Sequence, residues 1–168
     1  VLYLTDYIDE FVMQVMNNYD GKNFVNASSG EVDLDTKEEK EELTKKNEEY
    51  KDIFKVMKDT LKDNITDVCF THRLKNHPVC LVSDGNVSIE MEKVMNAMPT
   101  DDKVKANTIL EINENHEISK KLEKLYQSDK QELEKYTKVL YAQARLIEGL
   151  PIENPTEISN LVCEILSK

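Results

Sequence analysis

The chain has 168 residues, of which 39% are hydrophobic and 33% are charged, a composition typical of a globular domain. Its net charge of −11 argues against binding to nucleic acid, because the phosphate backbone would repel such a surface. Only four glycines are present and they are not clustered, so the sequence offers no phosphate-binding loop and no centre for nucleotide hydrolysis. No apolar run approaches the ~20 residues that a bilayer requires. Three cysteines without framework spacing indicate free thiols in a reducing compartment.

The N-terminal residues predict a strand, a helix and a second strand. The first four residues, VLYL, read as a strand, and because a buried strand requires neighbours, we expect the chain to be part of a longer protein. Thr5 or Asp6 can cap the following helix, and Asp20-Gly21 would end it. The sequence NFVNAS that follows is a possible second strand, which gives a β-α-β unit. Apolar side chains recur on one face of the helix at Ile8, Phe11, Val12, Val15, Met16 and Tyr19.

Residues 36–62 predict one long helix. Its first half is rich in lysine and glutamate and offers only Leu43 to a core, so we expect it to be solvated. An acidic docking segment is the less favoured interpretation, since mixed charges at helical spacing usually mark a solvent-exposed helix. The second half should pack on a core through an apolar side that comprises Tyr50, Ile53, Phe54, Met57 and Leu61.

Two cysteines and two histidines within residues 67–83 have the spacing of a zinc-ligand set. The same segment alternates in hydrophobicity as strands do, and the KNHP sequence in it is typical of a turn. In the resulting hairpin the two thiols start ~13 Å apart along the ribbon, whereas zinc requires ligands within ~2.3 Å of the metal. We therefore predict a β-hairpin and no metal site, and a metal-binding module is the alternative. The four residues concerned are Cys69, His72, His77 and Cys80.

Residues 87–98 predict a short helix that ends before Pro99. Three of the six methionines of the chain lie on its apolar stripe. Such a stripe usually packs into the core of its own domain, and the spacing alone favours that interpretation. The other interpretation is an adaptable binding surface, since the unbranched methionine side chain adjusts its shape to unlike partners. The stripe comprises Val87, Met91, Val94, Met95 and Met98.

Residues 108–112 alternate as a strand and should add to the hairpin, which gives a small three-stranded antiparallel sheet in an α+β fold. His116 follows at a helix start, where we expect it to make a local hydrogen bond. No serine or cysteine has a recognisable base and orienting carboxylate beside it, so no catalytic residue is predicted.

Three helices are predicted at the end of the chain. A short helix at residues 117–127 precedes a long one that Gly149 and Pro151 end, and Asn154 caps the last helix. The last helix is too short to be stable alone in water, so it must bury its apolar stripe. The preceding helix can cover part of that stripe, and a second copy of the chain can cover the rest in a four-helix bundle across a two-fold axis. Packing against the chain's own sheet is the alternative.

Four segments resemble, in the same order, sequences of the heat shock protein 90 chaperone family, closest to its bacterial HtpG type. They are LYLTDYIDEFVMQVMNNYDGKNF, ITDVCFTHRLKNHPVCLVSDG, ILEINENHEI and LYAQARLIEGLPIENPTEI. The resemblance implies that residues 1–40 are the end of the middle domain and residues 41–168 are the C-terminal dimerisation domain. It implies a dimeric, ATP-dependent molecular chaperone whose site for ATP and Mg lies in domains outside this chain. We therefore expect neither an enzymatic activity nor a cofactor in the chain itself.

The resemblance also assigns roles to residues, and it favours a binding surface for the methionine stripe. In the family, the last long helices join two protomers, and an amphipathic helix and a middle-domain helix contact unfolded client proteins. For the dimer interface the matching residues are Leu133, Tyr136, Leu140, Ile147, Ile158, Leu161, Val162 and Ile165. For client contact they are Val87, Met91, Val94, Met95 and Met98, together with Glu10, Phe11 and Gln14.

Departures from the family pattern bear on partners and on local structure. The zinc-like spacing is not a family motif, and Glu114 stands where many relatives have proline. The chain ends in EILSK without the acidic pentapeptide of cytosolic eukaryotic members, so we expect no tetratricopeptide co-chaperones. The expected partners are a second copy of the chain and non-native client proteins, with no nucleic acid and no membrane, in the bacterial cytoplasm.

Overall fold

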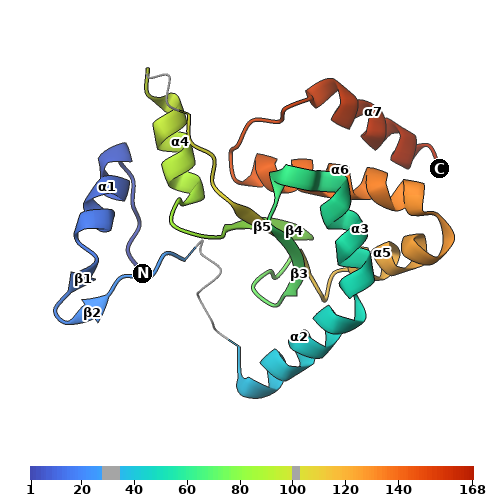
Figure 1. The fold of residues 1–168 in the computed structure, drawn as a ribbon, viewed down its shortest axis with the longest axis horizontal. Helices are drawn as coiled ribbons and strands as arrows, with labels where there is room; N and C mark the ends of the chain where they lie inside the picture. Colours follow the sequence, from blue (N-terminus) through green and yellow to red (C-terminus); the bar gives the residue numbers. More distant parts are fainter. Residues whose placement is uncertain (28–34, 100–102) are drawn as a thin grey trace. The chain divides into compact units, whose positions relative to one another are not determined.

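The computed structural model describes residues 1–27, 35–99 and 103–168, apart from the side chain of Tyr7. The predicted α+β class is confirmed (Figure 1). The described helices are α1 (Tyr7–Val15), α2 (Lys37–Glu49), α3 (Lys51–Leu61), α4 (Ile89–Ala97), α5 (Glu117–Ser128), α6 (Lys130–Ile147) and α7 (Pro155–Leu166), with a short 3-10 helix, η1, at Lys62–Asn64. The described strands are β1 (Asn18–Tyr19), β2 (Lys22–Asn23), β3 (Asp67–Thr71), β4 (Val79–Ser83) and β5 (Thr108–Asn113).

The chain divides into two compact units. Unit 1 consists of Val1–Asp33 and Ser83–Asn107 and contains α1, the β1–β2 hairpin and α4. Unit 2 consists of Leu34–Val82 and Thr108–Lys168 and contains the other helices and most of the three-stranded sheet. The domain boundary expected near residue 40 concerns the family's domains and stays a prediction. Among the described helices, none is long and apolar enough to cross a membrane.

The three-stranded sheet differs from the predicted antiparallel hairpin with an added strand. Its strand order is β3-β5-β4, and β5 pairs in parallel with β3. At one end of β4, Asn113 N donates to Pro78 O, and at the other end Asp84 N donates to Asn107 O, so β4 runs antiparallel to β5. The sheet is therefore mixed, and the hairpin prediction is wrong because β5 separates β3 from β4. Strand β5 is buried on both faces, which suits the central position.

Helix α3 packs on a core, as predicted, and the elements that it mainly contacts are β3 and α6. The single helix predicted over residues 36–62 is wrong, however, because the chain bends at Tyr50 (φ −92°, ψ 3°) between α2 and α3. The Tyr50 ring lies edge-on to Phe70 at 4.8 Å, and its hydroxyl donates to Glu123 at 2.8 Å. These contacts with β3 and α5 account for the bend. The buried residues of α3 are Ile53, Phe54, Met57 and Leu61.

Helix α2 is solvated, as predicted. None of its thirteen residues, all of which are described, is buried, and Leu43 is half-buried. Thr36 caps it in a capping box with Glu39. The side-chain oxygen of Asn47 accepts from Phe70 N at 2.8 Å, which fixes the C-terminal part of α2 beside β3. Polar contacts therefore hold a helix that has little apolar surface to bury.

Unit 1 begins with a helix that is shorter than predicted. Asp6 caps α1 as expected, but the helix ends at Val15 and not at Asp20-Gly21. Asp20 (φ 49°) and Gly21 (φ 71°) instead form the two-residue turn of the β1–β2 hairpin. Positive φ angles at both positions define the type I′ turn, whose twist matches that of the paired strands.

The predicted β-α-β unit is not present in the described part of the chain. Residues 1–4 and 24–27 are described and form no strand. Residue 28, the last of the predicted second strand, lies outside the described residues. The pairing partner of β2 is the short strand β1 just before it, so the local hairpin turn, and not a crossover, decides this topology.

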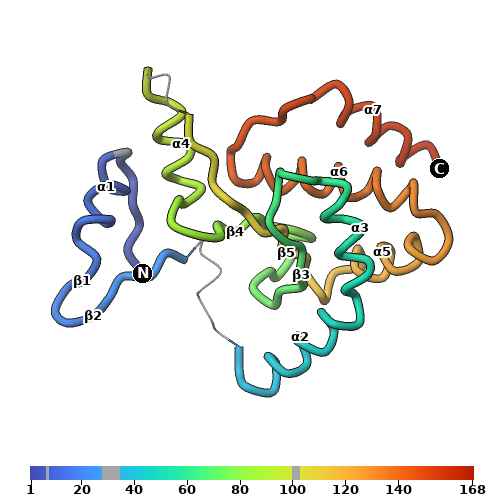
Figure 2. The backbone as a smooth tube through the Cα atoms, viewed as in Figure 1, coloured from blue at the N-terminus to red at the C-terminus, as the bar shows by residue number. Residues whose placement is uncertain are grey.

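The three C-terminal helices and their caps are as predicted, whereas the four-helix bundle stays a prediction. The side-chain oxygen of Asn154 caps α7 by accepting from Glu157 N at 3.2 Å, and Pro155 occupies the first helical position. Gly149 follows α6 with φ +71°, a left-handed conformation that glycine adopts without strain. Figure 2 shows α6 and α7 running side by side in opposite directions within unit 2.

Candidate functional site

Helix α4 carries the methionine stripe, and the structure divides that stripe by burial. Met91 and Val94 are only 7% and 6% exposed, whereas Met98 is 36% exposed. Val87 and Met95 are half-buried. Two of the five predicted client-contact residues of this stripe therefore face a packed environment, and three remain within reach of a partner.

The predicted residues of α1 lie in the same unit as α4. Gln14 is exposed, and Glu10 and Phe11 are half-buried. The Ser88 hydroxyl caps α4 by accepting from Met91 N at 2.9 Å, and it donates to the Glu10 carboxylate. Helices α1 and α4 are thus in contact within unit 1 (Figure 2). The structure brings together two groups of predicted residues that are far apart in the sequence.

The α6–α7 pair carries the predicted dimer-interface residues, which also differ in burial. Leu133 and Leu140 of α6 are buried, Tyr136 is half-buried and Ile147 is 44% exposed. None of the twelve residues of α7, all of which are described, is buried. The four predicted residues of α7 are each half-buried, namely Ile158, Leu161, Val162 and Ile165.

Two exposed leucines of this pair were missing from the predicted interface. Leu146 is 61% exposed at the end of α6, and Leu166 is 79% exposed at the end of α7. Their neighbour Ile147 and the apolar pattern of the last helix were the only signals in the sequence that pointed to them. Because the two helices are antiparallel, Leu146 and Ile147 lie at one end of the pair and Leu166 lies near the other, and we call these three exposed side chains together the α6–α7 apolar surface.

Two ion pairs join α6 to α7, a third joins α6 to the residue at the end of the chain, and their order shows that the two helices are antiparallel. Partners that come later along α6 pair with residues that come earlier in the C-terminal segment, as an antiparallel arrangement requires. A hydrogen bond from Lys138 lowers the pKa of Glu157, and the hydrogen bond to Glu164 raises the pKa of Lys135. The pairs are Lys135–Glu164, Lys138–Glu157 and Lys168–Glu132.

The zinc-like residues are distributed over the sheet. Cys69 of β3 lies in register with Glu111 of β5, and Cys80 Sγ of β4 lies 3.7 Å from the Glu111 carboxylate. Two strand spacings of ~4.8 Å separate the thiols, which is beyond disulfide range. Burial, followed by the negative charge of Glu111, raises the pKa of both cysteines to about 12. Within the described residues, no group of three or more potential ligands could hold a metal ion, so the geometry gives no support to the metal-binding alternative.

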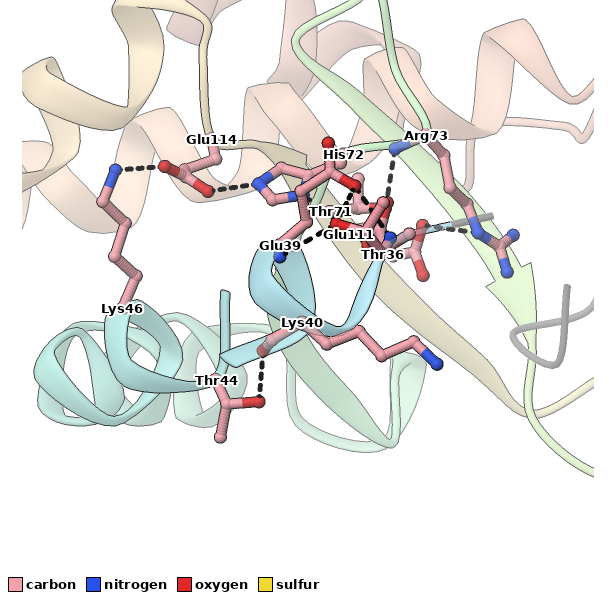
Figure 3. A network of polar contacts seen from close by, with 11 residues as sticks. Thr36, Glu39, Lys40, Thr44, Lys46, Thr71, His72, Arg73, Glu111 and Glu114 are labelled. Carbon is pink, nitrogen blue, oxygen red and sulfur yellow. Dashed lines mark hydrogen bonds and ion pairs between the residues drawn. The ribbon is translucent and has the colours of Figure 1, made fainter. Parts of the chain in front are cut away.

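His72 belongs to a polar network that connects α2 to the sheet (Figure 3). Its Nε2 lies 2.7 Å from Glu114 Oε2, and its Nδ1 lies 3.5 Å from the Asp35 carboxylate. Lys46 of α2 pairs with the other oxygen of Glu114. Burial alone would raise the pKa of Glu114, but the hydrogen bonds from Lys46 and His72 outweigh it and lower the pKa. This network connects α2 to the residues that follow β3 and β5.

A cleft of about 160 Å³ lies in unit 2 between α3, α6 and the segment that leads into α7. Arg145 Nε donates to Pro151 O at 2.8 Å, and its Nη1 donates to the Tyr141 hydroxyl at 3.0 Å. Lys138, also on the cleft, pairs with Glu157. The charged groups of the cleft therefore fix the connection between α6 and α7.

Comparison with known proteins identifies the family. A family model described as "Hsp90 protein" matches residues 1–168. The chain belongs to the heat shock protein 90 family. Its sequence is 46% identical over 166 residues to the "Chaperone protein HtpG" of Bacillus subtilis (strain 168), and 47% identical over 166 residues to that of Clostridium botulinum (strain Langeland). The corresponding protein of Clostridium perfringens (strain 13) is 46% identical over 166 residues.

These matches cover 99% of this chain and 26% of each of the three relatives. The chain therefore spans about a quarter of the length of the relatives it matches. The predicted resemblance to the HtpG type is confirmed.

Proposed function

We propose that this chain is the C-terminal part of an ATP-dependent molecular chaperone, in which it joins two copies of the protein and contributes to binding non-native client proteins. Membership of the heat shock protein 90 family supports the chaperone part of this proposal. The observation that carries the dimerisation part is the exposed α6–α7 apolar surface. Residues 1–40 then form the end of the middle domain, and residues 41–168 form the dimerisation domain.

The α6–α7 pair has the properties expected of one half of a four-helix bundle. With twelve residues, α7 is too short to be stable alone in water, and it depends on the surfaces against which it packs. Helix α6 covers one side of it and leaves Leu166 largely exposed. Full burial of a leucine stabilises a structure by ~1.5–3 kcal/mol. A second copy related by a two-fold axis can supply that burial with its own α6–α7 pair.

The client-contact surface of this proposal lies in unit 1. It comprises the accessible part of the α4 stripe, Val87, Met95 and Met98, with Phe11 and Gln14 on α1 beside it. Non-native proteins expose apolar side chains in no fixed arrangement, and methionine adapts its shape to such partners. Three further predicted residues support this surface without being fully accessible. Met91 and Val94 are buried, and Glu10 accepts a hydrogen bond from the Ser88 hydroxyl.

In this proposal the chain contributes assembly, and other domains of the full-length protein bind ATP and Mg and perform hydrolysis. The bundle keeps the two protomers at high effective concentration, so distant domains can close and reopen without separation of the dimer. A bacterial cytoplasmic chaperone with a second copy and non-native proteins as its partners fits this arrangement.

Sedimentation equilibrium of the 168-residue chain tests dimerisation. We expect a dimer for the unchanged chain and a monomer for the double variant Ile147→Glu with Leu166→Glu, because two charges would be buried in the interface. Both positions are exposed in the single chain, so the variant should keep its fold. Ser159→Glu, at an exposed polar position of α7, is the matched control and should stay dimeric. A monomeric unchanged chain at high concentration would refute the dimerisation part.

Binding of reduced, carboxymethylated α-lactalbumin, a permanently unfolded protein, tests client contact. We expect Met95→Asp to weaken binding by about threefold to tenfold, since it places a charge among apolar contacts. Ala97→Asp adds the same charge at an exposed position of α4 outside the stripe and should have little effect. Equal binding by the two variants would refute the client-contact part of the proposal and leave only the dimerisation part.

A further inference from the structure

An extended segment at residues 103–107 runs along α4 within unit 1. The Asn96 side chain makes two hydrogen bonds to Val104, as its Nδ2 donates to the carbonyl at 2.9 Å and its Oδ1 accepts from the amide at 3.1 Å. Glu92 Oε2 accepts from Ala106 N at 2.8 Å. Lys103 Nζ donates to the Asn96 carbonyl at 3.0 Å. We call residues 103–107, held in this way, the α4 strap.

The spacing of these contacts matches the geometry of the two partners. Four residues of helix rise ~6.0 Å, and two residues of extended chain span ~6.6 Å. Glu92 and Asn96 are four residues apart and lie on the same side of α4. Their partners Ala106 and Val104 are two residues apart and lie on the same side of the strap. Two side chains of the helix thus supply the hydrogen bonds that a neighbouring β-strand would otherwise make.

Helix α4 depends on such contacts because it is short. Nine residues do not form a stable helix alone in water, so its orientation is set by what holds it. Glu92 is 7% exposed, and its carboxylate accepts a charge-assisted hydrogen bond from a buried backbone amide. Breaking that bond would leave a buried donor unpaired.

We propose that Glu92 and Asn96 are positioning residues that, through the α4 strap, fix the rotation of α4 and so decide which side of the helix meets a client. This inference rests on the proposed client-binding function. The strap side and the side that carries Met91 and Met95 are offset by ~100° around the helix axis. A rotation that turned Met95 away from a client would break the paired hydrogen bonds of Asn96 to Val104. The strap is therefore a pre-organising element, which lowers the ordering cost of binding.

Amide hydrogen exchange of the 168-residue chain tests the strap without any client. We expect Asn96→Ala to accelerate exchange at Val104 by about tenfold, because the amide loses its acceptor and the segment opens locally. Glu92→Gln keeps an acceptor oxygen and should leave exchange at Ala106 close to that of the unchanged chain. Glu90→Ala, on the exposed side of the same helix, is the control. Unchanged exchange at Val104 in Asn96→Ala would overturn the inference.

Binding of reduced, carboxymethylated α-lactalbumin then separates positioning from a merely structural role. We expect about threefold weaker binding for Asn96→Ala, although Met95 and Met98 are intact, and near-normal binding for Glu92→Gln. Faster exchange with unchanged binding in Asn96→Ala, while Met95→Asp does weaken binding, would overturn the positioning role alone. If Met95→Asp has no effect either, the client surface itself is wrong, and the positioning role fails with it.

Discussion

Helices α4 and α7 are alike in length, apolar pattern and capping, and they differ in what covers them. Each is a short amphipathic helix, and each is capped by a side-chain oxygen that accepts from the third residue beyond it, Ser88 in α4 and Asn154 in α7. Yet Met91 and Val94 of the α4 stripe are buried, whereas none of the residues of α7, all of which are described, is buried. Amphipathic spacing therefore tells which side of a helix is apolar, and it leaves open what packs against that side.

The two helices also differ in how polar groups hold them. Glu92 and Asn96 of α4 bind the backbone of the strap, and Glu92 is buried. Helix α7 is held on α6 by ion pairs between side chains that remain partly exposed. Exposed ion pairs contribute little stability, so α7 has more to gain from a second copy than α4 has.

The largest contrast should come from two leucines of the α6–α7 pair. Leu133→Ala removes a completely buried side chain and should lower the free energy of unfolding by ~2–5 kcal/mol. Leu166→Ala should change it by less than ~0.5 kcal/mol in the monomer, because that side chain is largely exposed. Urea denaturation at two protein concentrations checks both values. Dimerisation through α7 predicts that the effect of Leu166→Ala grows with concentration, whereas the effect of Leu133→Ala does not.

A similar contrast is expected within the α4 stripe. Met91→Ala should destabilise the chain by ~2–4 kcal/mol, and Met98→Ala by less than ~0.5 kcal/mol, in line with their burial. Urea denaturation measures the difference. Equal effects of the two substitutions would mean that the stripe is not divided into a packed part and an accessible part.

The Glu114 network should make a smaller, pH-dependent contribution. Because the pKa of Glu114 is lowered in the folded chain, its stabilising effect is present above its unfolded value of 4.5 and is lost as the pH falls through the folded value. We expect Glu114→Gln to cost ~1–2 kcal/mol at pH 7, where hydrogen bonds to a charged group are lost. The cost should shrink towards zero well below pH 4.5, as urea denaturation across that pH range would show. A difference that persists in acid would assign the effect to side-chain shape and not to charge.

The smallest effect is expected for the ion pairs of α6 and α7. Lys138→Gln removes the partner of Glu157 and should lower the midpoint of thermal unfolding slightly in low salt. The difference should disappear at 1 M NaCl, because the screening length falls to ~3 Å and the attraction between the two charges is suppressed. Differential scanning calorimetry at the two salt concentrations measures it. A salt-independent loss would indicate that the Lys138 stem contributes by packing.

Local signals in the sequence predicted the C-terminal helices well, but they did not predict the end of α1 or the division between α2 and α3. The C-terminal elements were correct because proline, glycine and capping residues act within one turn of helix, as at Asn154, Pro155 and Gly149. The break at Tyr50 was not predictable, since it depends on Phe70 and Glu123, which are distant in sequence. The same holds for the insertion of β5 between β3 and β4.

The sequence predicted which residues belong to the candidate sites, but it did not predict which of their side chains are exposed. Resemblance to the family named the stripe of α4 and the faces of α6 and α7, but only packing distinguishes Met91 from Met98 and Leu133 from Leu166. The strap was missed because Glu92 and Asn96 are ordinary polar residues of a helix, and their partners are backbone groups. The spacing of four residues between them was the only signal.

The sequence by itself determined the family, the α+β class and the C-terminal helices with their caps, because each depends on short-range periodicity or on whole segments of matching residues. Tertiary structure alone decided the strand order, the bend at Tyr50, the contact between α1 and α4, and which apolar side chains are covered. These features depend on contacts between residues far apart in the chain. The free energy of each such contact depends on how all the helices and strands pack together, which no local segment of the sequence specifies.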